Sequence, residues 1–240
     1  MKIAVIIPYY PSGNTDELYT RCLDSVSPQF EVYDLIDFKH EGVSAMRNKG
    51  LDYIFKAYPD TDYITFLDAD DTYAPNAYEQ MCEAINESPD EGIIQLNHVR
   101  EHPDGRTQLR LPSKRGTYDL SRMPNLWVSS CNKLFKAELV RNIRFIEGLS
   151  HGEDELFVLN CLAKTRRMYV SDRIALHYHK DNPNSLSTRT SLDDILGEQR
   201  ALLDFLATHK SDKEICELVR VRQAELWNNA CYKRVFGGTE

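Results

Sequence analysis

The chain has 240 residues, of which 42% are hydrophobic and 28% are charged, and its formal net charge is −8. These values are typical of a folded domain with a large core, and they exclude a chain dominated by disorder; the negative charge also opposes non-specific binding to nucleic acid or to anionic lipid. Six cysteines without a CxxC pair favour reduced thiols over a disulfide framework or a zinc site.

The first element is a short strand. Residues 3–8 (IAVIIP) are a run of β-branched apolar residues without alternation, which is typical of a strand covered on both faces of a parallel sheet. The run is too short to span a membrane and has no signal-peptide cleavage pattern, so we expect an unanchored cytoplasmic chain. Asn14 and Glu17 resemble a capping box, which predicts a helix in the residues that follow.

Strands and helices then alternate. We predict strands at 30–38 and 62–67, a helix at 43–58, and a helix at 75–87 that has Pro75 at its first position. Such alternation implies parallel crossovers and a ligand crevice at the carboxyl ends of the strands. The predicted inward residues are Met46, Gly50, Tyr53, Ile54 and Ala57 in the first of these helices and Tyr78, Met81, Cys82 and Ile85 in the second.

The second half of the chain has a different pattern. Residues 92–100 and 106–112 flank the turn sequence EHPDG, so we expect an antiparallel hairpin. Helical patterns follow, and one late strand stands among them. The predicted elements are helices at 136–142 and 154–165, a strand at 167–179, and helices at 191–207 and 211–235, the last opened by a Ser211–Glu214 capping box.

Three aspartates close the third strand in YITFLDADD, residues 63–71. Carboxylates at alternate positions beyond a strand end can point to a common cavity, and Mg²⁺ and Mn²⁺ prefer oxygen ligands of this kind. The alternative is that Asp68, Asp70 and Asp71 cap the helix near Pro75 and begin a polar loop.

Six stretches in one order then identify a resemblance. VIIPYY, CLDSV, GVSAMRNKGLDY, YITFLDADD, CNKLFKAELV and HGEDELF lie between residue 3 and about residue 160. Together they resemble the family 2 glycosyltransferases, which have the nucleotide-sugar-binding fold called GT-A. The resemblance implies an α/β domain over 1–188, with a mostly parallel central sheet flanked by helices and a small antiparallel hairpin. A helical extension over 189–240 is expected to pack on it.

The resemblance also implies roles for the carboxylates. Asp68 is expected to face the ribose and the cation, and Asp70 to ligate a Mn²⁺ or Mg²⁺ that bridges the two phosphates of a nucleoside diphosphate sugar. Asp154 in HGEDELF is expected to be the general base of an inverting displacement. The adjacent Glu153 lies on the acceptor side, where its charge could raise the pKa of the base. The alternative is that these acids belong to an ordinary first helical turn.

Nucleotide contacts follow from the same resemblance. Pro8 and Tyr10 are expected near the base, Asp37 at uracil, and Ala69 at the donor within DAD. The usual DDGS after the second strand is replaced by LIDFKHEG, which leaves Asp37 and the choice of uridine open. Arg47 matches the family's ARN segment, with a solvated helix face as the alternative.

Three further positions complete the expected site. Asn48 also belongs to the ARN segment, or else holds its loop together. His179, in the loop LHYHKDNPNSLS, is expected to contact the cation or a phosphate, and a surface turn is the alternative. Trp127 could stack on an acceptor sugar or base, although tryptophan is more often a core residue.

Basic residues gather around the predicted hairpin, on what would be the acceptor side of the fold. They could meet a phosphorylated or nucleic-acid acceptor, but a solvated hairpin face is the interpretation that we favour. They are Arg100, Arg106, Arg110, Lys114 and Arg115.

We therefore predict a metal-dependent, inverting, hexosyltransferase-like enzyme. It would move a sugar from a UDP-sugar to the hydroxyl of a glycan, a lipid-linked sugar or another compound. Two alternatives are a nucleotidyltransferase that makes nucleotide sugars and an inactive protein that binds them. The first would normally carry a Gly-rich basic loop after the first strand, and PYYPSGN has one glycine and no lysine or arginine.

Overall fold

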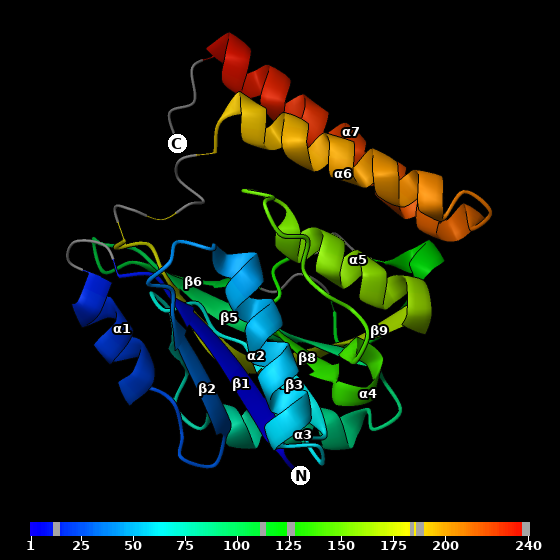
Figure 1. Ribbon diagram of the computed structural model, residues 1–240. Helices are drawn as coiled ribbons and strands as arrows, with labels where there is room; N and C mark the ends of the chain where they lie inside the picture. The colour runs from blue at the N-terminus through cyan, green and yellow to red at the C-terminus, as the bar shows by residue number, and fades with distance from the viewer. Residues whose placement is uncertain (12–14, 111–113, 124–127, 183–184, 186–189, 237–240) are drawn as a thin grey trace.

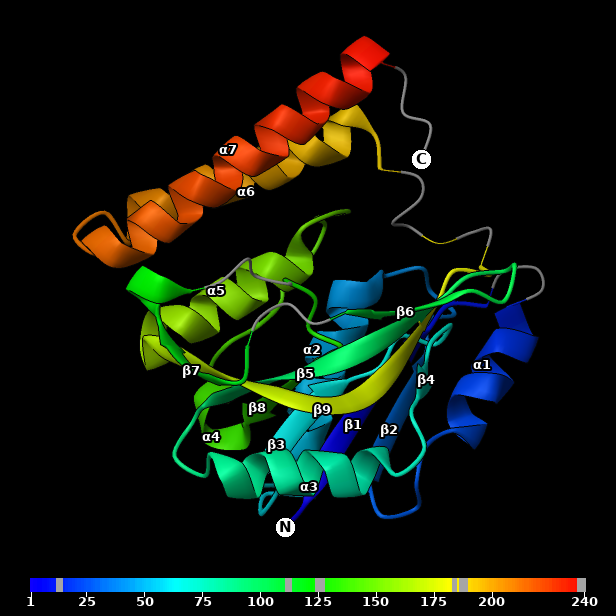
Figure 2. The same ribbon diagram turned by 180° about the vertical axis from the view of Figure 1, so that it is seen from behind.

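The computed structural model describes residues 1–11, 15–110, 114–123, 128–182, 185 and 190–236, with side chains described as far as 228. Its described strands form one sheet in the order β2-β1-β3-β8-β5-β9-β4, with β6 paired to β5 and β7 paired to β9. Helix α2 covers the face of the sheet seen in Figure 1, and α3 covers the face seen in Figure 2.

The N-terminal half has the predicted parallel crossovers. Strand β1 (Ile3–Tyr9) lies between β2 (Glu31–Ile36) and β3 (Tyr63–Phe66) and is parallel to both. Helix α1 (Thr15–Asp24) follows β1, and Asn14 of the expected capping box lies outside the described residues. The β-branched run of β1 is buried along its length, as the absence of alternation predicts.

Helix α2 (Val43–Ala57) buries three of the five residues predicted to face inward, which are Met46, Gly50 and Ile54. Tyr53 and Ala57 are exposed, whereas Arg47 and Asn48 are buried. Gly50 does face the core, because a Cβ there would lie 2.5 Å from Ile6 Cγ2. The buried side of α2 therefore carries polar groups, which need partners inside the protein.

Helix α3 (Ala77–Glu87) begins two residues later than predicted. Its N-cap is Asn76, with a φ of 60°, so Pro75 precedes the helix rather than opening it. Met81 and Ile85 are buried as expected, and Tyr78 and Cys82 are half-buried against the core.

The hairpin prediction is confirmed by β5 (Ile93–Glu101) and β6 (Thr107–Arg110), which pair antiparallel. Strand β9 (Arg167–His179) has the predicted bounds and runs parallel to β5. Three strands and one 3-10 helix were not predicted. They are β4 (Thr72–Tyr73), β7 (Gly116–Asp119), η1 (Leu120–Arg122) and β8 (Lys133–Lys136), which lies antiparallel between β3 and β5.

Helices α4 (Ala137–Val140) and α5 (Glu153–Thr165) precede β9. Helix α6 (Leu192–Thr208) then begins at a Ser191–Asp194 capping box. It packs beside α7 (Lys213–Phe236), and the two helices form a C-terminal hairpin on the α5 side of the molecule (Figures 1 and 2). At α7, Asp212 Oδ1 accepts the Ile215 N–H at 3.2 Å, so Asp212 makes the cap that we assigned to Ser211. Among the described helices, none combines the length and apolar character needed to cross a bilayer.

Candidate active site

A cleft of about 1080 Å³ opens where β1 and β3 end and α5 begins. This is the edge at which parallel α/β sheets bind ligands. Of the residues expected at the donor or the base, Asn48 and His179 do not line the cleft, and Trp127 lies outside the described part of the chain. Of the basic residues around the hairpin, Arg100 lines it, whereas Arg106, Arg110, Lys114 and Arg115 do not. The other expected residues line it: Pro8, Tyr10, Asp37, Arg47, Asp68, Ala69, Asp70, Asp71, Glu153 and Asp154.

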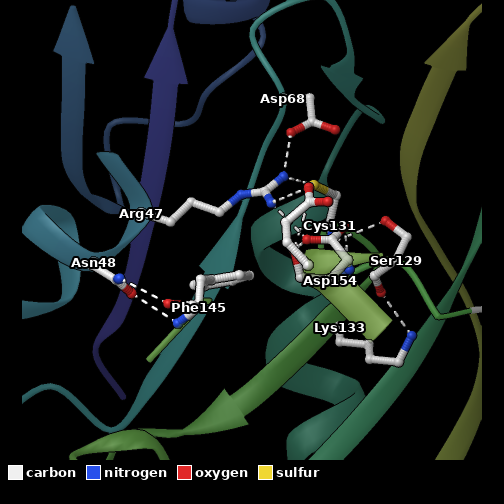
Figure 3. A network of polar contacts seen from close by, with 10 residues as sticks. Arg47, Asn48, Asp68, Ser129, Cys131, Lys133, Phe145 and Asp154 are labelled. Atoms are coloured by element: carbon white, nitrogen blue, oxygen red, sulfur yellow. Dashed lines mark hydrogen bonds and ion pairs between the residues drawn. The ribbon is translucent and has the colours of Figure 1, made fainter. Parts of the chain in front are cut away.

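Arg47 connects the two acidic segments (Figure 3). Its Nη2 donates to Asp68 Oδ1 at 2.8 Å, and its Nη1 donates to Asp154 Oδ1 at 2.6 Å and to Glu153 Oε1 at 3.2 Å. The side chain is 2% exposed and lies against the Phe145 ring. Burial lowers the pKa of Arg47, but the surrounding carboxylates outweigh burial and raise it, so the guanidinium is a fixed positive charge.

The Asp154 carboxylate is fixed from a second side by the segment before β8. Ser130 donates its hydroxyl to Oδ1 at 2.9 Å and its backbone N–H to Oδ2 at 3.1 Å. Lys133 holds this segment, because its Nζ donates to Ser129 O at 2.8 Å and to Asn132 Oδ1 at 3.0 Å. Burial lowers the pKa of Lys133 to about 7. Because Ser130 bonds to both of its carboxylate oxygens, Asp154 has a defined orientation at the first turn of α5.

Asp70 and Asp71 differ in their surroundings. Asp70 lines the cleft and accepts a hydrogen bond from Asn182 Nδ2 at 2.7 Å; burial raises its pKa, and Asp68 raises it further. Asp71 is 1% exposed, and its Oδ1 accepts the backbone N–H of His179 at 2.9 Å. Asp71 thus binds the end of β9, whereas Asp70 faces the space where a ligand would lie.

The protein side chains at the site have a limited capacity to bind a metal by themselves. Across the described residues, no group of three or more His, Cys, Asp and Glu side chains is arranged to hold an ion by itself. Asp68 and Asp70 supply two carboxylates at one edge of the cleft, and one or two carboxylates are enough for Mg²⁺ when substrate phosphates complete its shell. The donor set fits a cation that arrives with a phosphorylated ligand.

Asp37 lines the cleft but is also bound by its own loop. Its carboxylate accepts the backbone N–H groups of Glu41 at 2.9 Å and Gly42 at 2.8 Å. Burial raises the pKa of Asp37, and the backbone donors outweigh that effect and lower it. Asp37 therefore shapes the turn into α2, at Gly42, whose φ of 91° suits glycine.

Two predicted contacts face away from the cleft. Asn48 Oδ1 accepts the Phe145 N–H at 2.8 Å and its Nδ2 donates to Phe145 O at 3.0 Å, so Asn48 holds a loop, as our alternative reading has it. The His179 ring contacts Thr72 Oγ1 at 2.8 Å through Nε2 and Glu101 Oε2 at 3.2 Å through Nδ1. Both ring nitrogens are occupied, which leaves none for a cation or a phosphate in this conformation.

A cationic wall forms the side of the cleft built by β5 and β9. Arg100 and Lys180 supply its positive charges and face the cleft with Tyr178, whereas Glu101 points to the other face. His98 also lines the cleft, but burial lowers its pKa to about 4, so its ring is neutral near pH 7. Arg100 Cζ and Lys180 Nζ lie 5.6 Å and 4.9 Å from the centre of the Tyr178 ring. Burial lowers the pKa of Arg100, and the neighbouring Arg110 lowers it further, as expected where positive charges gather.

Sequence reasoning missed three contributors to the site. Lys133 stands in the quoted CNKLFKAELV stretch and Ser130 directly precedes it, but no pattern linked them to Asp154. Arg21 Nη1 donates to Asp181 at 2.6 Å and its Nη2 donates to Asp70 O at 2.9 Å, which joins the Asp70 turn to the residues after β9. A lone arginine on an amphipathic helix gives no signal for such a contact.

The comparisons with known proteins agree with this geometry. Residues 12–144 match the sequence profile of Glycosyl transferase family 2, which is more than half of the chain. The chain therefore belongs to glycosyl transferase family 2, as predicted.

Individual relatives are more distant. The minor teichoic acid biosynthesis protein GgaB of Bacillus subtilis (strain 168) is 26% identical over 155 residues, and the match covers 62% of this chain and 17% of that protein. The crystal structure of S. aureus TarS 1–349 with UDP-GlcNAc matches with a TM-score of 0.69 at 18% identity, over 91% of this chain and 72% of that one. The same protein with UDP matches with a TM-score of 0.64. These likenesses confirm the predicted GT-A fold.

Proposed function

We propose that the chain transfers a sugar from a nucleoside diphosphate sugar to a hydroxyl acceptor by one displacement, with inversion. The observation that carries the proposal is that Asp70 and Asp154, from distant segments, line one cleft. A uridine nucleotide is the first donor to test, because the TarS structures hold UDP-GlcNAc and UDP.

In this proposal Asp154 is the general base. Its Oδ1 is occupied by Arg47 and Ser130, whereas Oδ2 accepts one hydrogen bond from the described residues, from the Ser130 N–H. A carboxylate oxygen can accept two hydrogen bonds, so Oδ2 can also receive an acceptor hydroxyl. Asp154 would take the hydroxyl proton as the oxygen bonds to the anomeric carbon and the bond from that carbon to the diphosphate breaks.

Asp70 and Asp68 would hold a divalent cation together with the donor. Such an ion supplies charge neutralisation at the departing diphosphate. Each carboxylate already accepts one hydrogen bond among the described contacts, Asp68 from Arg47 and Asp70 from Asn182. Asn182 and Arg21 keep the Asp70 turn in place, through the Asp70 side chain and backbone carbonyl respectively.

The acceptor that best fits the cleft carries negative charge. Arg100 and Lys180 form a cationic wall on the β5 and β9 side, in a chain whose net charge is −8. Phosphate groups are bound by positive side chains of this kind. The curated relative acts in teichoic acid biosynthesis, which makes a teichoic acid the first acceptor to test.

The test is an assay for UDP release from UDP-GlcNAc and other UDP-sugars with Mn²⁺, with and without teichoic acid, and with neutral oligosaccharides as a comparison. Acceptor-dependent release, with a product of inverted anomeric configuration by NMR, is the expected result. Donor binding without turnover on any acceptor would instead favour an inactive binding protein. For the acceptor class, R100Q should lower turnover on the phosphate polymer and leave donor affinity unchanged, and equal loss on neutral acceptors would contradict the charged-acceptor proposal.

A further inference from the structure

The C-terminal hairpin reaches the cleft through two side chains. Glu198 of α6 and Arg222 of α7 line the same cavity as Asp154. The hairpin packs on the α5 side of the molecule, and the matched family segment ends at residue 144, well before it. These two helices therefore contribute to the walls of the site, and nothing in the family match gives them a role.

Both side chains are bound to the segment that carries Asp154. Arg222 Nε lies 3.1 Å and 3.0 Å from the two carboxylate oxygens of Glu155, the residue after Asp154. Glu198 Oε2 contacts His151 Nδ1 at 2.8 Å. Glu155 and Glu198 are each 1% exposed. Charged groups buried to this degree keep a fixed geometry, because each depends on its partner for the solvation it has lost.

The two glutamates also contact each other. Burial raises the pKa of Glu155 to about 8; Arg222 opposes the rise and a hydrogen bond with Glu198 adds to it. Within the described part of the chain, no hydrogen-bond donor reaches the buried Glu198 Oε1. One proton shared between the two carboxyl groups satisfies this oxygen and removes the like-charge repulsion. The pair then links α5 directly to α6.

Gly152 shows how closely α6 approaches the turn before α5. A Cβ at this position would lie 2.5 Å from Glu198 Cγ, and the φ of 83° is one that other residues rarely adopt. Glu198 therefore packs against the backbone of the turn as well as against the His151 ring. A side chain at Gly152 would displace the turn or the helix.

We propose that Glu198 and Arg222 are positioning residues for the reaction: they hold residues 151–155 from the hairpin side, as Arg47 and Ser130 hold Asp154 from the core side. Asp154 stands between Glu153, which contacts Arg47, and Glu155, which contacts Arg222. A carboxylate fixed from both sides keeps the alignment that proton transfer needs. This inference rests on the proposed function for its kinetic readout.

The test compares E198A with E198Q and with E217A. Alanine removes the partner of His151 and Glu155, whereas glutamine keeps an acceptor for His151 and a donor for Glu155. Glu217 is an exposed residue of the same hairpin that pairs only with Arg220 among the described contacts, so E217A is the matched control. E198A should lower kcat about 10- to 100-fold with the donor Kd unchanged within about twofold, and E198Q should recover most of the loss.

Hydrogen exchange gives a readout that does not need activity. The amides of residues 150–156 should exchange faster in E198A than in the wild-type chain and in E217A. The inference is wrong if E198A leaves the exchange of these amides unchanged, and it is also wrong if E198A leaves kcat unchanged. If the wild-type chain transfers no sugar, the proposed function fails, and the exchange result alone then supports or overturns the coupling between the hairpin and the turn.

Discussion

Arg47 donates a hydrogen bond to Asp154 at 2.6 Å from inside the protein, and the same guanidinium binds Asp68 at 2.8 Å. The acid that ends β3 and the acid that begins α5 therefore share one buried cation. This arrangement sets the distance between Asp68, on the donor side of the proposed reaction, and Asp154, its proposed base. It also makes the charge balance of the site depend on one side chain.

Replacing Arg47 tests that dependence. R47M leaves three carboxylates beside a buried apolar chain, and we expect a loss of about 3 to 5 kcal/mol in the free energy of unfolding. R47K keeps the charge but cannot bridge Asp68 and Asp154 with a planar fork, so it should fold and lose turnover about tenfold or more. Urea unfolding and initial rates measure both. An R47M protein as stable and as active as the wild type would contradict this role.

Metal removal tests the roles of Asp70 and Asp68. EDTA should abolish transfer, and added Mn²⁺ should restore it. D70N should raise the Mn²⁺ concentration needed for half-maximal rate about tenfold or more, because a carboxylate ligand is lost from a site with few of them. D204N, at an exposed position on α6, is the matched control and should titrate like the wild type. Full activity in EDTA would rule out the cation.

The glutamate pair between α5 and α6 predicts how stability changes with pH. The pKa of Glu155 is raised from 4.5 to about 8, so between these values the folded chain keeps a proton that the unfolded chain releases. His151 also has a raised pKa, chiefly because of its hydrogen bond to Glu198. Both effects stabilise the fold most at low pH and are lost as the pH rises, through about 8 for Glu155, so the free energy of unfolding should fall from pH 6 to pH 8.

The matched variant for this prediction is E198Q, whose amide can bond to Glu155 and His151 without a shared proton. Its free energy of unfolding should fall less steeply with pH than that of the wild type. The two slopes should differ by the effect of up to one proton, which is about 1.4 kcal/mol per pH unit. Urea unfolding at pH 6, 7 and 8 gives the slopes, with E217Q as the control. Identical slopes for E198Q and the wild type would mean that the pair shares no proton.

The elements with strong patterns could be predicted from the sequence. Strand β9 and the β5–β6 hairpin carry clear apolar runs and turn residues, and they lie where we expected them. Strands β4 and β8 are short, and they form only because β9, β3 and β5 offer open edges. Such pairing depends on partners far away in the chain, so local pattern alone does not reveal it.

The location of Asp70 and Asp154 at one cleft was predictable, because each stands in a motif at a strand or helix end. The site was less predictable where burial depends on distant partners. Arginine is rarely buried, so the sequence leaves Arg47 on either face of α2 until the carboxylates of two other segments are in place. The contacts of Glu155 with Glu198 and Arg222 are a further example, because acids at a helix start usually face solvent.

The central claim is that Asp154 deprotonates an acceptor hydroxyl, which attacks a sugar donor bound at Asp70. The most direct measurement is D154N, assayed for binding of UDP-GlcNAc with Mn²⁺ by calorimetry and for transfer by UDP release. The account predicts a donor Kd within about threefold of the wild-type value and a turnover lowered at least about a thousandfold. Wild-type turnover in D154N would contradict it.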